Sequence, residues 1–127
     1  MYKGFILLFL LFSTLFAQPL ETLSSYDAAI KKGLKENKRV LMLIYSDYCS
    51  WCEKMQKKTL SNEKVVAFIQ KDFVFVKINR EKGEYPKEFI PRFIPTTYLI
   101  DPKSQEEIYA LYGYKTATQF LDELSDE

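Results

Sequence analysis

Apolar residues first recur with the period of a helix between positions 26 and 34. Tyr26, Ile30 and Leu34 are spaced four apart, so they lie along one side of a predicted helix. Ser24 or Ser25 is placed to cap its start, because a serine oxygen accepts a hydrogen bond from an N–H of the first turn. The pattern therefore predicts an amphipathic helix at the beginning of the domain.

Two continuous apolar runs follow, and both have the length of a strand. Residues 40–45 are apolar throughout, and residues 73–78 are interrupted only by Lys77. Such runs are typical of strands that are buried on both faces. Between them, residues 52–59 have helical character, and Ser61 is placed to cap a further helix. Three residues of that helix are expected to face inward: Val65, Val66 and Ile69.

The last part of the chain predicts a hairpin and a final helix. Residues 96–100 and 108–112 have strand patterns and are joined by the turn residues 101–104. Thr116 and Gln119 have the spacing of a capping box, in which each side chain binds a backbone N–H of the other residue. The helix that follows is expected to bury Phe120, Leu121 and Leu124.

The order of these elements predicts the fold class. Helices alternate with strands, a short helix near residues 87–90 precedes Pro91, and the hairpin comes near the end. This order favours an α/β architecture with a mixed central β-sheet flanked by α-helices. The chain is long enough for one such domain and too short for two.

The first 17 residues have the pattern of a signal peptide. Lys3 gives a positive start, residues 5–16 are almost wholly apolar, and Ala17 is the small residue after which a signal peptidase would cut. The apolar run is shorter than the about 20 residues that a helix needs to span a bilayer. An N-terminal anchor or a buried first helix is the alternative. We expect residues 1–17 to be a signal peptide and residues 18–127 to form the domain.

The content of cysteine and histidine limits the chemistry. Without Lys3 the chain carries 17 basic and 17 acidic side chains and no basic block, so a nucleic-acid partner is not expected. Two Cys and no His do not supply the about four ligands of a zinc site. A Cys–His nucleophile pair is excluded because the chain has no His. Attachment of a c-type haem is excluded because Glu53 stands where that motif needs His. We expect neither a metal nor a cofactor, and the remaining chemistry is that of the two sulfurs.

The two cysteines lie where a predicted strand ends and a helix begins, in the motif Cys49-Ser50-Trp51-Cys52. Free N–H groups at a helix start favour a thiolate, so Cys49 is the expected nucleophile. Cys52 lies one turn further in and is the expected resolving thiol, and the two-residue spacer lets the sulfurs form a Cys49–Cys52 disulfide. The alternative is an inert bridge, but a loop this short constrains the unfolded chain only weakly.

A second candidate element is Ile94-Pro95-Thr96, at the start of a predicted strand. A proline here could follow a cis peptide bond, which is rare and usually has a purpose. The alternative is an ordinary trans proline at a strand start. Trp51, Tyr48 and Phe93 are the aromatic residues expected near the dithiol, where with the Ile94-Pro95 segment they would bind an extended peptide. The alternative for Tyr48 and Phe93 is packing in the core.

These motifs resemble the thioredoxin superfamily over roughly residues 24–126. Residues 40–45 followed by 48–52 resemble the first core strand and the active-site motif of that family. Residues 76–79 and then 92–96 resemble the segment that leads to its cis-proline. Residues 54–74 look closer to the exported thioredoxin-like branch than to cytosolic thioredoxin. The resemblance implies the thioredoxin fold, with Cys49 as nucleophile, Cys52 as resolving thiol and Pro95 as the cis-proline.

The sequence also departs from the family pattern. Leu43 stands where thioredoxins have a buried Asp that handles the proton of the second cysteine, so water, Glu53 or Asp47 would have to serve. The spacer is Ser-Trp instead of Gly-Pro, and Phe93 replaces a glycine that is common just before the cis-proline segment. Phe93 makes the expected substrate groove more apolar.

The resemblance implies a thiol–disulfide oxidoreductase of the bacterial envelope, located in the periplasm. It would reduce protein disulfides as a monomer and receive electrons from a membrane-bound thiol donor. The reducing direction is favoured because the chain has no His to stabilise the thiolate, as strong oxidants of this fold often do. The alternative is a non-catalytic binding module with a structural CxxC disulfide.

Export makes a direct prediction about the mature protein. When the protein is produced with its leader in a bacterium, N-terminal sequencing of the secreted form should begin at or near Gln18, because cleavage follows Ala17. Recovery of a soluble cytoplasmic form that keeps Met1 would contradict the assignment.

Overall fold

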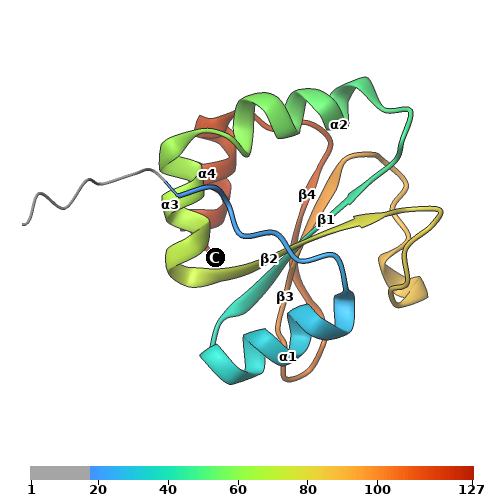
Figure 1. Cartoon of the computed structure of the whole chain (residues 1–127), viewed down its shortest axis with the longest axis vertical. Helices are drawn as coiled ribbons and strands as arrows, with labels where there is room; N and C mark the ends of the chain where they lie inside the picture. Colours follow the sequence, from blue (N-terminus) through green and yellow to red (C-terminus); the bar gives the residue numbers. More distant parts are fainter. Residues whose placement is uncertain (1–17) are drawn as a thin grey trace, which may run out of the picture.

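The computed structural model describes residues 18–127, and the predicted signal peptide, residues 1–17, lies outside the described residues. A four-stranded sheet forms the centre of the domain (Figure 1), and its strand order is β2-β1-β3-β4. The strands are β1 (Arg39–Tyr45), β2 (Phe73–Asn79), β3 (Thr96–Ile100) and β4 (Glu107–Tyr112). β1 pairs with β2 in parallel and with β3 antiparallel, and β4 is antiparallel to β3, so the sheet is mixed as predicted.

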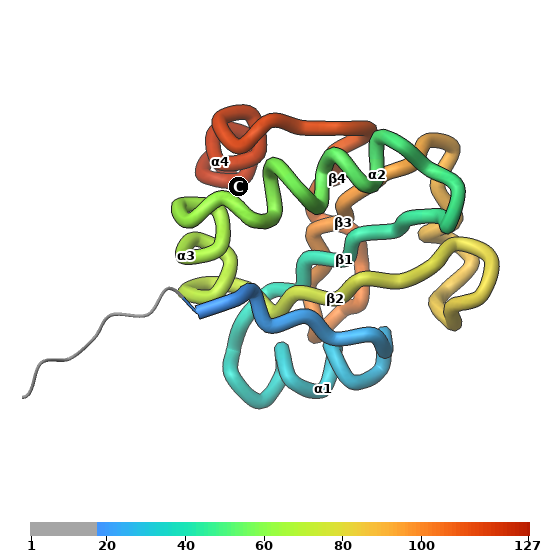
Figure 2. The backbone as a smooth tube through the Cα atoms, turned by 45° about the horizontal axis from the view of Figure 1, so that its top comes forward, coloured from blue at the N-terminus to red at the C-terminus, as the bar shows by residue number. Residues whose placement is uncertain are grey.

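Helices cover both faces of this sheet. They are α1 (Tyr26–Glu36), α2 (Ser50–Lys54) with a π-helical continuation (Met55–Thr59), α3 (Glu63–Asp72), a 3₁₀ turn (Lys87–Phe89) and α4 (Ala117–Ser125). α1 packs on one face, and α3 and α4 lie together on the other (Figure 2). Within residues 18–127, no helix has both the length and the apolar character needed to cross a membrane.

The central strand β1 is buried on both faces, which explains its continuous apolar run. Val40, Met42 and Ile44 belong to a cluster with residues of α1, whereas Leu41 and Leu43 belong to a cluster with residues of α3 and α4. All five side chains are almost completely inaccessible to solvent. The prediction of a strand without a polar face is therefore confirmed.

The start of α3 differs from the prediction. Asn62 caps this helix, because its side-chain oxygen accepts hydrogen bonds from the N–H groups of Lys64 and Val65, at 3.0 and 3.3 Å. The Ser61 hydroxyl instead donates to the carbonyl oxygen of Lys57 in the preceding helical segment. The prediction of Ser61 as the cap is wrong by one residue, since the chain becomes extended, as a cap requires, only at Asn62.

The other predicted helix starts agree with the structure. The Ser25 hydroxyl accepts a hydrogen bond from the Ala28 N–H at 3.2 Å, and Thr116 and Gln119 form the predicted capping box. Leu34, however, is 50% exposed. Leu34 lies eight residues after Tyr26, and at about 100° per residue its side chain is rotated about 80° around the helix axis from that of Tyr26. Leu34 therefore points away from the sheet.

A polar cluster joins the end of β2 to the loop that precedes Cys49. The Asn79 side-chain oxygen accepts hydrogen bonds from the N–H groups of Glu81 and Lys82, both at 3.0 Å. Its amide group donates to the Asp47 carboxylate at 2.9 Å, and the Lys82 amine contacts the same carboxylate at 2.5 Å. The hydrogen bond and the charge of Asp47 raise the pKa of Lys82. Asn79 therefore holds two loops together next to the dithiol.

The Asn79→Ala variant tests this connection. It leaves two backbone N–H groups without their acceptor and removes one of the two partners of the Asp47 carboxylate, so the free energy of unfolding should fall by about 1–3 kcal/mol. Urea denaturation measures this loss. Ser46→Ala is the matched control, because it removes only the exposed hydrogen bond from Ser46 to Glu81 and should change stability by less than about 0.5 kcal/mol. Equal effects of the two substitutions would contradict a special role for Asn79.

Candidate active site

The two cysteines lie at the start of α2, directly after the loop that follows β1. Cys49 and Cys52 form a disulfide, with their Cα atoms 5.2 Å apart. Cys49 is half-buried, whereas Cys52 is only 6% exposed. Cys49 has an extended backbone and caps the helix, and the Cys52 N–H donates to its sulfur at 3.1 Å. A backbone N–H that points at Cys49 Sγ stabilises negative charge on that atom in the reduced protein.

The loop before β3 lies beside these sulfurs. The Ile94 carbonyl oxygen is 4.0 Å from Cys49 Sγ, and the Ile94–Pro95 peptide bond is cis. The Gly113 N–H donates to the Pro95 carbonyl at 2.7 Å, and the Thr96 hydroxyl donates to the carbonyl of Phe93 at 2.6 Å. The start of α2, the loop before β3 and the residue after β4 therefore meet at one end of the sheet.

An open pocket of about 520 Å³ adjoins the dithiol and this loop. Its lining residues are Trp51, Phe93, Ile94, Tyr112, Gly113 and Tyr114, which we call the aromatic pocket. The Trp51 and Tyr114 rings have centroids 5.6 Å apart, and those of Phe93 and Tyr112 are 6.4 Å apart. The Lys54 amine lies 5.1 Å from the Trp51 ring and 4.8 Å from the Tyr114 ring.

The structure brings most of the expected binding residues together. Trp51, Phe93 and Ile94 line the aromatic pocket, and the buried Pro95 lies in the adjoining loop. Trp51 is 55% exposed and Phe93 62% exposed, so neither is a core residue. Tyr48 precedes Cys49 but is fully exposed and does not line the pocket.

Sequence reasoning missed the contribution of β4. Tyr112 pairs with Thr96 in the antiparallel register, which places it opposite the residue after Pro95. Gly113 then ends the strand with a φ of 78°, and Tyr114 returns towards Trp51. The available indication was the glycine between two tyrosines at the end of the predicted hairpin.

The position of the family's buried acid is apolar here. Leu43 is buried, and its neighbours in the sheet are Lys77 on β2 and Thr97 on β3. The Lys77 amine contacts the Gln56 side chain and lies 4.3 Å from the ring of Tyr45. Burial lowers the pKa of Lys77. A cation, and no carboxylate, therefore flanks Leu43 in the sheet.

Of the two acids expected near Cys52, one is held by other side chains and the other is exposed to solvent. Asp47 is held by Asn79 and Lys82, and Glu53 is exposed on α2. In residues 18–127, no three side chains of His, Cys, Asp or Glu are grouped so as to hold a metal ion.

Comparison with known proteins gives relatives that carry this domain within longer chains. A human protein, spermatogenesis-associated protein 20 (Homo sapiens), is 35% identical over 69 residues, which are 54% of this chain and 9% of that protein. An uncharacterized protein from Borreliella burgdorferi is 33% identical over 104 residues, which are 80% of this chain and 44% of that protein. The chain thus matches less than half the length of either relative.

Solved structures share the same architecture. A thioredoxin from Thermus thermophilus superimposes with a TM-score of 0.73 at 22% identity, over 86% of this chain and 87% of that one. A DsbH oxidoreductase gives a TM-score of 0.71 at 17% identity, over 86% and 84% of the two chains. The family model of the thioredoxin-like domain matches residues 26–126. The chain therefore belongs to the family of thioredoxin-like domains.

Proposed function

We propose that the protein is a thiol–disulfide oxidoreductase that reduces disulfides of other proteins through Cys49 and Cys52. The observation that carries the proposal is the position of Cys49. Its sulfur accepts a hydrogen bond from the Cys52 N–H and lies 4.0 Å from the carbonyl oxygen of Ile94. The half-buried sulfur of Cys49, its buried partner Cys52 and the Ile94 backbone thus lie close together, which supports these roles.

The reaction takes place in two exchanges. The Cys49 thiolate attacks one sulfur of a substrate disulfide, a Cys49–substrate bond forms, and the other substrate sulfur leaves as a thiolate. The Cys52 thiolate then attacks Cys49 Sγ, which forms the Cys49–Cys52 disulfide and releases the second substrate thiolate. Two electrons pass from the dithiol to the substrate, and the proton of Cys52 is lost in the second exchange. Because Leu43 supplies no carboxylate, we assign acceptance of that proton to water.

Substrate binding would use the surface around the sulfurs. The backbone of Ile94 pairs with an extended substrate segment beside Cys49, and Pro95 fixes the loop that presents it. Trp51 and Phe93, which line the adjoining pocket, supply apolar contact area for that segment. Tyr48 would contact the substrate from its exposed position before Cys49.

The cellular setting of the proposal is the bacterial periplasm. Residues 1–17 would direct export and be removed, and residues 18–127 would act as a monomer. The oxidised dithiol would be reduced again by a membrane-bound thiol donor. The signal-peptide pattern of residues 1–17 supports this setting, and the lack of His in the chain supports a reducing role.

An equilibrium titration of the Cys49–Cys52 pair against glutathione and dithiothreitol buffers tests the function. A reductase should have a potential between about −200 and −300 mV, because thioredoxin itself lies near −270 mV. A potential above about −150 mV would make the protein an oxidant. A potential below about −300 mV would indicate a structural bridge, and with it the binding module.

Substitution of each cysteine tests their separate roles. The Cys52→Ser variant should accumulate mixed disulfides with client proteins, because the intermediate on Cys49 is not resolved. The Cys49→Ser variant should trap few, since the remaining thiol is buried. Non-reducing gels of the affinity-purified variants measure the difference, and equal trapping would contradict the assignment of Cys49 as the nucleophile.

A further inference from the structure

The aromatic pocket has the chemistry of a site for a large apolar side chain. Four aromatic side chains line it, and Phe93 and Tyr112 are 62% and 56% exposed in the absence of a partner. Gly113 also lines it, at a φ of 78° that favours glycine, so this part of the lining carries no side chain. An apolar side chain that entered would remove these rings from water, which is favourable in proportion to the area buried.

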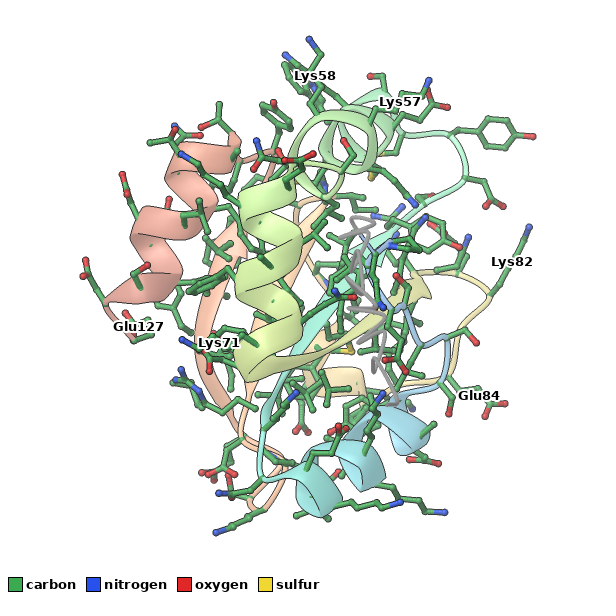
Figure 3. All side chains as sticks on the ribbon, turned by 60° about the vertical axis from the view of Figure 1, so that its left-hand side comes forward. Lys57, Lys58, Lys71, Lys82, Glu84 and Glu127 are labelled. Carbon is green, nitrogen blue, oxygen red and sulfur yellow. A yellow bond between two sulfur atoms is a disulfide. The ribbon has the colours of Figure 1, made fainter. Side chains whose placement is uncertain are left out.

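A positive charge borders the same pocket. The Lys54 amine lies over the rings of Trp51 and Tyr114, at 5.1 and 4.8 Å from their centroids. Within residues 18–127, no carboxylate oxygen lies within 4.0 Å of this amine. Lys57 and Lys58 are exposed on the next turn and project into solvent from the same helical segment (Figure 3). A partner bound here would therefore contact both the aromatic rings and the positive charge of Lys54.

The location relative to Cys49 determines what the occupant must be. Ile94 lines the pocket, and its carbonyl oxygen is 4.0 Å from Cys49 Sγ. A side chain that fills the pocket while a sulfur of the same peptide contacts Cys49 comes from a residue close to that sulfur in the substrate. The occupant is thus part of a peptide segment that carries the disulfide.

We propose that the protein selects disulfides in peptide segments that carry a large apolar residue next to the attacked cysteine, followed by acidic residues. The apolar side chain fills the aromatic pocket, and the carboxylates pair with Lys54 and the neighbouring lysines. This inference rests on the proposed function, because it names the substrate class of the same dithiol.

Three cysteine peptides test the selection, each with 2-nitro-5-thiobenzoate bound to its sulfur as a coloured leaving group. One carries Phe after the cysteine and then two Asp, one carries Phe and two Lys, and one carries Gly and two Asp. With reduced mature protein at low salt, the Phe–Asp peptide should react about tenfold faster than the Phe–Lys peptide, and this ratio should shrink at about 1 M salt. The Phe–Asp peptide should also react about fivefold faster than the Gly–Asp peptide.

Matched variants assign these ratios to the named residues. Lys54→Glu should abolish or invert the preference for acidic over basic peptide, whereas Lys71→Glu should keep it. The Lys71→Glu substitution changes the charge by the same amount, but in the last turn of α3 (Figure 3). Tyr112→Ala should lower only the ratio of the Phe–Asp to the Gly–Asp rate. Ile108→Ala should not, because Ile108 is an exposed residue of the same strand outside the pocket.

The neutral disulfide of 2-mercaptoethanol separates this inference from the proposed function. If the wild type reduces it but reacts equally fast with all three peptides, the substrate selection is overturned and the oxidoreductase stands. Equal ratios in Lys54→Glu and Lys71→Glu would likewise overturn the role of Lys54. No reduction of the neutral disulfide would overturn the proposed function itself, and the inference with it.

Discussion

The burial of β1 on both faces is the constraint on which the rest of the molecule depends. A strand without a polar side must have helices above and below it and a strand on each edge, since no part of it can face water. α1 covers one face, α3 and α4 cover the other, and β2 and β3 supply the edges. This buried strand ends at Tyr45, four residues before Cys49, so the position of Cys49 is set from the core.

The pairing of β1 with β3 brings the second half of the site to the first. The antiparallel register joins Ile44 to Thr96, so the beginning of β3 lies next to the end of β1. Pro95 and Ile94 directly precede Thr96 and are thereby carried to the sulfurs. The pairing of Thr96 with Tyr112 likewise brings the end of β4 next to the beginning of β3. The site is thus a product of strand register, although its residues come from three separate parts of the chain.

The sequence predicted the features that depend on local pattern. The apolar runs gave β1 and β2, and the capping box gave the start of α4, because each follows from neighbouring residues alone. The cap of α3 was misplaced, since Ser61 and Asn62 are both able to cap and only the backbone conformation decides between them. Contacts between distant residues were not predictable. Tyr112 reaches the pocket through strand register, and Asn79 reaches Asp47 through the spatial meeting of two loops.

The placement of Trp51 has a consequence for how the molecule can be observed. It is the only tryptophan in the chain, and it stands between the two sulfurs of the motif. Its ring is partly exposed, with an amine at 5.1 Å and a tyrosine ring at 5.6 Å. Light emitted by this indole therefore originates at the dithiol itself. Tryptophan fluorescence of this protein therefore reports on the dithiol alone, because no other tryptophan contributes to the signal.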